Sequence, residues 1–345
     1  MSDVARLAGV SAQTVSRTLS GHPHVQPDTR ARVLAAVEQL GYRRNSAARA
    51  LSSGRSRTLG VVTLQTGFAS RIALTVGVET AAARAGYAVS SVTTPSLDAD
   101  AIESALSRLA DREVEGIVLA VPLVTTNAAI EELTRLVPTV ATDGSRTPST
   151  EVLTIDQSAI GALATRHLLE LGHRTVWHVS GPEEWRDAAG REQGWRDELA
   201  AAGIQPPPVL PGDWSPESGY RNGLILARVP DATAVFVASD EMAFGVIRAL
   251  HEQGRSVPGD VSIVGVDDIP LAAYCSPALT TIAQPFTEVG RLAVEHLLAT
   301  IGTAHDASRR RSPTDDAAPA AAPSLIIEPT LIVRDSTATP TASAD

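Results

Sequence analysis

The chain has 345 residues, enough for two or three domains, and its hydrophobic content of 43% is sufficient for a buried core. Its net charge of −10, taken as an average, argues against a nucleic-acid partner. The charge is uneven, however, because residues 1–60 hold nine Arg against three acidic residues, a local charge of +6 that leaves −16 on the remainder. This asymmetry predicts a basic DNA-binding module on an acidic body.

Cysteine usage and hydropathy indicate the compartment. The single Cys275 excludes an internal disulfide, the first residues have no apolar signal core, and no run approaches membrane-spanning length. We therefore expect a cytoplasmic protein with no membrane partner.

Two short helices separated by a tight turn are predicted at the N-terminus. Asp3 can cap a helix that runs through Ala8, Gly9 permits the turn, and Ser11 can cap a second helix that ends at Leu19. The sequence therefore predicts a helix-turn-helix.

The second predicted helix has one polar and one apolar face. Gln13, Ser16 and Arg17 fall within one arc, whereas Val15 and Leu19 lie together on another face. This division suits a recognition helix, because a helix fits the major groove and Gln or Arg can bond base edges. The spacing alone would also fit an ordinary αα-hairpin.

A third helix favours the DNA-binding interpretation. It is expected to begin at Pro27 and Asp28 and to end at Gly41, with an apolar side at core spacing. The residues expected on that side are Val33, Leu34, Val37 and Leu40.

At these residues the chain resembles the LacI/GalR family of bacterial transcription regulators. The motif Asp-Val-Ala-x-x-Ala-Gly-Val-Ser-x-x-Thr-Val-Ser-Arg is specific, and the resemblance continues to about Arg334. It implies a homodimer on pseudo-palindromic double-stranded operator DNA, a hinge helix that orders only on the operator, and a small-molecule effector. The family usually has Tyr-x-Pro-Asn before the hinge, whereas this chain has Tyr42, Arg43, Arg44 and Asn45.

The resemblance also implies which residues touch DNA. Ala12, Gln13 and Arg17 would read bases, and Leu51 would be a wedge in the central minor groove. The full set of expected DNA-binding residues is Ser11, Ala12, Gln13, Thr14, Ser16, Arg17, Asn45, Arg49 and Leu51.

From Thr58 onwards, short apolar runs alternate with amphipathic helices. The expected strands are residues 59–64, 88–93, 116–121, 139–142, 152–155, 175–179, 234–238 and 261–266, and the expected helices centre near residues 78, 106, 133, 168, 199, 224 and 246. This alternation predicts α/β architecture, with parallel sheets covered on both faces. Eight strands are too many for one small sheet. We therefore expect a split near Asp156 into two doubly wound halves, with a cleft at the carboxyl ends of their strands.

The resemblance makes this body a two-lobed, periplasmic-binding-protein-like core with three crossovers between its lobes. The expected fold class is an all-α helix-turn-helix head joined by a hinge helix to that α/β core. The expected divisions are a head at 1–45, a hinge and linker at 46–57, and a core at 58–335, with an N-lobe of 58–155 plus 286–301 and a C-lobe of 156–283 plus 325–334. We expect a disordered loop at 303–324 and a disordered tail at 336–345.

Polar residues that follow the predicted strands are expected to point into the cleft. They are Asp143, Ser239, Asp240, Asp267 and Asp268. Carboxylates suit sugars, since they accept hydrogen bonds from adjacent hydroxyls. For Asp240 we prefer a simpler role as the cap of the next helix.

Trp214 stands in a turn-like Gly-Asp-Trp-Ser stretch after several prolines, a setting that favours an indole facing the cleft, where it could stack on a sugar. By resemblance, the expected effector-binding residues are Phe68, Asp143, Arg191, Trp214, Ser239, Asp267, Gln284 and Phe286. In the matching pattern Ser239 replaces an Asn, and Asp187 replaces a small hydroxyl residue.

Two other protein classes share this architecture. An enzyme is not expected, nor is a metal or cofactor, because the sequence has no Gly-x-Gly-x-x-Gly, phosphate loop, Gly-x-Ser-x-Gly or metal-spaced His or Cys cluster. His167, His173 and His178 lack ligand spacing, so surface or capping roles are expected. A sugar-binding protein that serves a transporter would need export and has no use for a basic head.

The favoured function is a repressor of sugar-utilisation genes that a mono- or disaccharide releases from its operator. A ligand that instead strengthens DNA binding, as a co-repressor, is the alternative.

Overall fold

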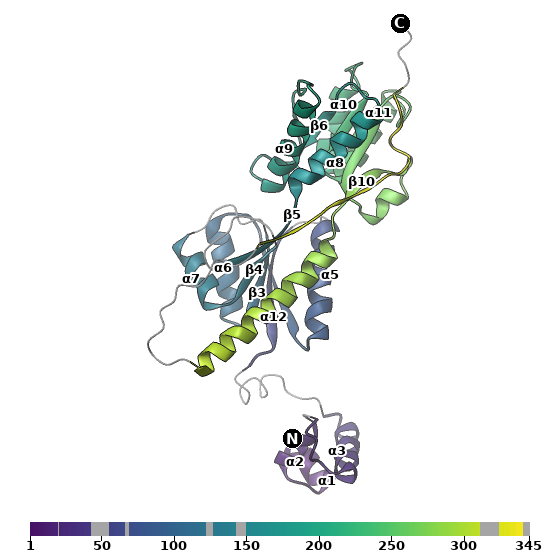
Figure 1. Ribbon diagram of the computed structural model, residues 1–345. Helices are drawn as coiled ribbons and strands as arrows, with labels where there is room; N and C mark the ends of the chain where they lie inside the picture. Colours follow the sequence, from purple (N-terminus) through teal and green to yellow (C-terminus); the bar gives the residue numbers. More distant parts are fainter. Residues whose placement is uncertain are drawn as a thin grey trace. The chain divides into compact units, whose positions relative to one another are not determined.

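A computed structural model describes residues 1–19, 21–42, 55–65, 69–121, 127–142, 150–310 and 324–340 (Figure 1). The chain divides into two compact units, Met1–Ser56 and Arg57–Asp345, here named the head and the core. Within the described ranges, no helix has the length and apolarity needed to cross a membrane.

The head contains α1 (Ser2–Ala8), α2 (Ala12–Leu19) and α3 (Pro27–Gln39). Gly9 ends α1 at φ 63°, in the left-handed region that favours glycine, and turns the chain towards α2. Ser11 Oγ accepts from the Thr14 N–H at 3.1 Å and so caps α2, as expected. Val15 and Val33 are fully buried in a small apolar core. The predicted helix-turn-helix is therefore confirmed.

Two details of the head differ from expectation. Asp3 does not cap α1, because the helix begins one residue earlier; it lies in the first turn, where it pairs with Arg6 at 3.1 Å. Leu34 and Leu40 are 49% and 45% exposed, because the narrow buried side of α3 runs through Ala36 instead.

The first sheet of the core, the N-lobe sheet, has the order β11-β5-β4-β3-β1-β2, and its strand pairs are all parallel. Its strands are β1 (Thr58–Leu64), β2 (Ala88–Thr94), β3 (Gly116–Ala120), β4 (Thr139–Ala141), β5 (Thr150–Ile155) and β11 (Ser324–Ile327). One face is covered by α5 (Ala69–Arg84) and α12 (Phe286–Arg310), and the other by α6 (Ala99–Ala110) and α7 (Ala128–Leu136).

The second sheet, the C-lobe sheet, has the order β12-β10-β9-β8-β6-β7, and only β12 is antiparallel to its neighbour among the described strands. Its strands are β6 (Trp177–Ser180), β7 (Leu210–Pro211), β8 (Ala234–Val237), β9 (Ser262–Asp267), β10 (Thr280–Ala283) and β12 (Thr330–Ile332). One face is covered by α8 (Gln157–Glu170) and α9 (Arg186–Ala201), and the other by α10 (Pro216–Leu226) and α11 (Asp240–Glu252). A short 3-10 helix, Pro270–Ala273, follows β9.

The described chain passes between the lobes three times, from β5 to α8, from β10 to α12 and from β11 to β12. Figure 1 shows the last passage in yellow. One apolar cluster includes side chains from the α5–α12 face of the N-lobe and from the α8–α9 face of the C-lobe. The predicted two-lobed α/β fold with three crossovers is confirmed, whereas the hinge helix expected within 46–57 lies largely outside the described residues.

Two expected boundaries in the C-terminal part are wrong. Residues 325–327 do not belong to the C-lobe, because β11 pairs in parallel with β5 of the N-lobe sheet. Residues 303–310 are not a loop, because α12 continues to Arg310.

The tail expected to be disordered from residue 336 is held on the C-lobe as far as residue 340. Ser336 is fully buried, and its hydroxyl donates to Ile263 O at 2.6 Å while it accepts from the Thr280 N–H at 2.8 Å. These bonds satisfy backbone groups of two strands, so the tail completes the C-lobe.

Three helix pairs approach to backbone contact through glycines. The glycines are Gly77 and Gly290 between α5 and α12, Gly161, Gly190 and Gly194 between α8 and α9, and Gly219, Gly223 and Gly245 between α10 and α11. A Cβ added to Gly161 would lie 2.0 Å from Arg191 O, and one added to Gly194 would lie 1.9 Å from Ser158 O. Because α8 and α9 are so close, the side chains of Gln157 and Arg191 can meet.

Two histidines expected in surface or capping roles are buried. His178 is fully buried in β6, stacks on Phe236 with ring centroids 4.6 Å apart, and bonds Phe236 O through Nδ1 at 3.1 Å. His173 contacts Ser262 Oγ and Ala338 O, both at 3.1 Å. Burial lowers the pKa of His178 to about 3, so this ring is neutral in the folded chain.

Acid should therefore destabilise the fold through His178. The unfolded chain protonates this ring below its ordinary pKa of about 6.5, whereas the folded chain does not, so stability is full above that pH and is lost as the pH falls. At about pH 5 the loss from one such residue is about 2 kcal/mol. Urea unfolding at about pH 7.5 and about pH 5 measures it. His178→Leu should weaken the pH dependence, while His251→Leu, at an exposed position, should not; equal pH dependence in wild type and His178→Leu would contradict the argument.

Candidate functional site

The outer face of α2 forms the first candidate site. Gln13, Ser16 and Arg17 are exposed on it together with Ala12, whereas Val15 is buried in the core of the head. The apolar face of α2 thus packs in the core of the head, and its polar face is exposed to solvent. A helix that inserts into a major groove needs such an exposed polar face. At the start of the helix, Ser11 and Thr14 bond each other through their hydroxyls at 2.9 Å. The other expected DNA-binding residues, Asn45, Arg49 and Leu51, lie outside the described residues.

The second candidate site is a pocket between the lobes. It is lined by Leu74, Thr142, Thr154, Ile155, Gln157, Asp187, Phe286 and Val289. Phe286, expected from the sequence, forms part of its apolar wall. Thr142 Oγ1 is buried and has no hydrogen-bond partner among the described residues. The pocket thus joins apolar walls to a few polar groups, but its volume of about 10 Å³ has room for about one water molecule, so the lobes are closed together around it.

Arg191 connects this pocket to an aromatic pair. Its Nε donates to Gln157 Oε1 at 2.8 Å and its Nη1 donates to Ala238 O. Its guanidinium carbon lies 5.4 Å from the ring centroid of Trp214, and Trp185 meets Trp214 edge-on at 5.7 Å. A buried guanidinium beside indole rings can bond hydroxyl groups and contact the apolar face of a sugar.

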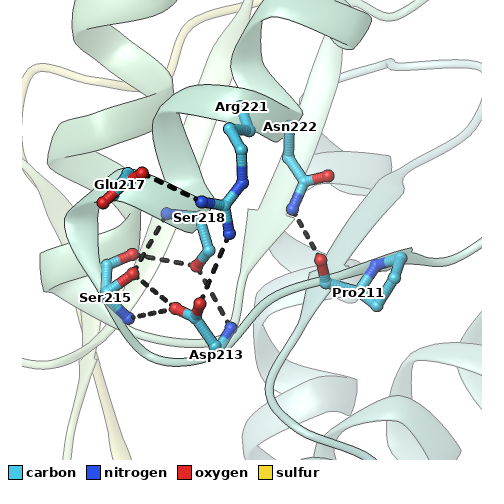
Figure 2. Close-up of polar contacts among 7 residues, drawn as sticks. All are labelled: Pro211, Asp213, Ser215, Glu217, Ser218, Arg221 and Asn222. Carbon is cyan, nitrogen blue, oxygen red and sulfur yellow. Dashed lines mark hydrogen bonds and ion pairs between the residues drawn. The ribbon is translucent and has the colours of Figure 1, made fainter.

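The turn that carries Trp214 is fixed by the capping of α10 (Figure 2). Ser215 Oγ accepts from the Ser218 N–H at 3.1 Å, and Asp213 Oδ1 accepts from the Ser215 N–H at 2.9 Å. The bond from the Ser215 hydroxyl is the main cause that lowers the pKa of Asp213. Trp214 itself has φ 68°, and a Cβ added to Gly181 would lie 2.2 Å from its ring. The cap and this close packing set where the indole lies.

Asp267 and Gln284, both expected from the sequence, lie together at the end of β9. Gln284 Nε2 donates to Asp267 Oδ1 at 2.5 Å. Asp267 and Asp268 have φ values of 112° and 51°, an unfavourable conformation for residues other than glycine. Arg334 holds the second of them, because its Nη2 donates to Asp268 Oδ1 at 2.6 Å.

The expectation that Asp240 caps the following helix is wrong. Ser239 is the cap, since its Oγ accepts from the Met242 N–H at 3.2 Å. Asp240 is fully buried and accepts from Thr281 Oγ1 at 2.6 Å and from the Ile269 N–H at 2.9 Å. Burial, together with the Asp267 carboxylate, raises the pKa of Asp240 well above its ordinary value. Asp240 therefore supports the strained turn at the end of β9.

The structure thus gathers Arg191 with Trp214 and Asp267 with Gln284, whereas Phe68 and Asp143 lie outside the described residues. Sequence analysis missed Thr142 and Gln157 at the pocket. Thr142 was expected to end the strand at 139–142, whereas β4 ends at Ala141, and Gln157 is separated from β5 by the capping Asp156.

Comparison with known proteins decides the family. Residues 1–45 match the model for bacterial regulatory proteins of the lacI family, and residues 165–337 match the periplasmic binding protein-like domain. The ribose operon repressor of Haemophilus influenzae is 33% identical over 344 residues, which cover 97% of this chain and 98% of that protein. The chain belongs to the LacI family of bacterial regulatory proteins.

Other members agree over most of the chain. The lactose operon repressor of Escherichia coli is 34% identical over 301 residues, which cover 86% of this chain and 83% of that protein. A structure of the lac repressor dimer bound to operator and the anti-inducer ONPF matches with a TM-score of 0.85 at 30% identity, covering 97% of this chain and 98% of that one. This LacI-family protein is therefore a DNA-binding transcription regulator and not an enzyme, as expected.

Removing the cap of α10 should disturb Trp214. Ser215→Ala deprives the Ser218 N–H of its acceptor, and we expect the free energy of unfolding to fall by about 1 kcal/mol. Urea unfolding gives this change, and tryptophan emission reports the altered surroundings of the indole. Ser91→Ala, at an exposed position of β2, is the control that should change neither. Wild-type stability and emission in Ser215→Ala would show that the cap does not hold the turn.

Proposed function

We propose that this LacI-family regulator is a cytoplasmic repressor of sugar-utilisation genes, and that a mono- or disaccharide releases it from its operator. The observation that supports this most is a group of an indole pair, a buried guanidinium and a carboxylate, which hydrogen bonds through Gln157 and Gln284 link beside the pocket between the lobes. Relatives named as ribose and lactose operon repressors favour a sugar over other small molecules.

Several side chains in this region have the chemistry needed to bind a sugar. Asp267 can accept hydrogen bonds from adjacent hydroxyls, and such bonds to a charged group contribute about 1.5–3 kcal/mol each. Arg191 can donate to ring and hydroxyl oxygens. Trp214 is buried in an apolar cluster of the C-lobe, so its stacking on the apolar face of a sugar remains a prediction. Gln284 and Phe286 complete the set assigned here. The roles of Phe68, Asp143 and Ser239 remain predictions of the family resemblance.

Operator binding requires two copies of the head. One short recognition helix reads only a few base pairs, so we infer a homodimer on a pseudo-palindrome with half-sites about one helical turn apart. The matching lac repressor structure is a dimer on operator, which supports this inference. A minor-groove wedge at Leu51 remains a prediction.

Arg17 should read a base within each half-site. We expect Arg17→Ala to reduce the binding free energy for the operator by about 1–3 kcal/mol per half-site, because a bidentate contact to one base edge is removed. The wild-type protein first selects an operator from random duplexes. Fluorescence anisotropy with that duplex and with a scrambled one then measures the loss. Arg135→Ala removes the same charge from the exposed side of α7 in the core and serves as the control. If Arg17→Ala keeps full discrimination between the two duplexes, α2 is not the recognition helix.

Sugar binding and operator release should both depend on Asp267. We expect a binding saccharide to raise the thermal midpoint of the wild type and to weaken operator affinity 5- to 150-fold, the range of a coupling of about 1–3 kcal/mol. Asp267→Asn removes the charge yet tolerates the φ of 112° better than Ala would, and it should abolish both effects. Asp100→Asn, on the exposed side of α6, is the control.

A thermal-shift screen of mono- and disaccharides, begun with D-ribose and lactose, supplies the sugar for this experiment. Tighter operator binding with a hit would establish the co-repressor alternative. A hit that leaves operator affinity unchanged would refute the coupling, and one that Asp267→Asn binds as tightly as wild type would refute the site.

A further inference from the structure

Four side chains form a continuous hydrogen-bonded series across the crossovers between the lobes. Arg191 Nε donates to Gln157 Oε1 at 2.8 Å, Gln157 Nε2 donates to Gln284 Oε1 at 3.1 Å, and Gln284 Nε2 donates to Asp267 Oδ1 at 2.5 Å. We name this series the amide relay. It joins residues 127 positions apart in the sequence at its central bond.

The two ends of the relay dictate the orientation of both amides. A guanidinium can only donate, so Gln157 must turn its carbonyl to Arg191, which leaves its NH₂ for Gln284. An ionised carboxylate can only accept, so Gln284 must turn its NH₂ to Asp267, which leaves its carbonyl for Gln157. Both requirements give the same central bond. A positive and a negative end thus polarise the amides in one direction, and the bonds strengthen one another.

The relay also lies where the lobes are connected. Gln157 is the first residue of α8, directly after the first crossover, and Gln284 stands in the second crossover, between β10 and α12. Gln157 is held on one side by α9, because a Cβ added to Gly190 would lie 2.7 Å from its Cβ. Gln157 is also one of the residues that line the pocket. A single side chain therefore contacts α9, the other crossover and the cleft.

We propose that Gln157 is a positioning residue of the effector cleft, which fixes Arg191 and Gln284 for the sugar and makes the two crossovers move together. The part that concerns the sugar rests on the proposed function; the linkage of the crossovers does not. The relay connects Arg191 to Asp267 through the two amides, so a change in the contacts of one end alters the bonds of the other.

Hydrogen–deuterium exchange of the full-length, sugar-free protein tests the linkage. Gln157→Met has similar volume but neither donor nor acceptor, and it should still fold, because the cap of α8 comes from Asp156, whose Oδ1 accepts from the Ala159 N–H at 2.8 Å. We expect peptides from both crossovers, residues 155–160 and 283–287, to exchange about tenfold faster, since the bonds that hold them to each other are lost.

The exchange rate in the second crossover, residues 283–287, distinguishes a relay from local packing. If Gln157 only packed locally, exchange would rise around α8 and stay at the wild-type rate in residues 283–287, which would overturn the proposal. Gln193→Met, on the exposed side of α9 two positions from Arg191, is the matched control and should change neither segment. Gln157→Glu keeps the acceptor for Arg191 but repels Gln284 Oε1, so it too should speed exchange in residues 283–287.

Calorimetric titration with D-ribose and with lactose tests the positioning of Arg191 and Gln284. For a sugar that the wild type binds, Gln157→Met should weaken affinity about tenfold, while Gln193→Met keeps it. Unchanged affinity in Gln157→Met would overturn the positioning role. If the wild type binds neither sugar, the choice of sugar in the proposed function fails, and the exchange rates of the two crossovers still decide whether the relay exists.

Discussion

The need to satisfy polar groups where the chain passes between its two sheets shapes the centre of this molecule. Three passages bring backbone and side-chain groups into a region with an apolar cluster on one side. An unpaired polar group there would cost about 1–3 kcal/mol. The sequence meets this need with two glutamines, whose amides both donate and accept and can therefore continue a series of bonds that begins at a cation and ends at an anion.

A second constraint acts at the anionic end. Asp240 is fully buried, and its burial, followed by the nearby carboxylate of the partly exposed Asp267, raises its pKa. The turn after β9 is strained at both of its aspartates, and it is held by bonds from Asp240, Gln284 and Arg334. Strain of this kind persists only where several contacts determine it, and it occurs often at ligand sites.

Patterns among neighbouring residues predicted the strands, the division into two lobes and the exposed face of α2. The alternation of apolar runs gave the strands and the split near Asp156, and the polar arc of Gln13, Ser16 and Arg17 gave the exposed face of α2. What they could not give is the choice of distant partner. Nothing in residues 324–327 shows that they pair with β5 and not with a strand of the C-lobe sheet, because an apolar strand can extend the edge of either sheet.

The same limit applied to side chains. The family resemblance pointed to Gln284 but not to Gln157, and only the tertiary fold brings the two amides to 3.1 Å. His178 was expected in a surface or capping role because it lacks ligand spacing, and Ser336 was expected in a disordered tail. Each is buried because its polar group bonds a strand carbonyl, a partner that periodicity does not show.

The energies involved show how a small ligand can act through such a centre. Coupling between an effector site and a DNA site amounts to about 1–3 kcal/mol, and a hydrogen bond to a charged group contributes about 1.5–3 kcal/mol. The free energy of one end bond of the relay is therefore comparable to that of such a coupling. A sugar that takes Asp267 from Gln284, or Arg191 from Gln157, need not deform either sheet. It only has to be a better partner in one arrangement of the lobes than in the other, since a ligand shifts an equilibrium by no more than its difference in affinity for the two states.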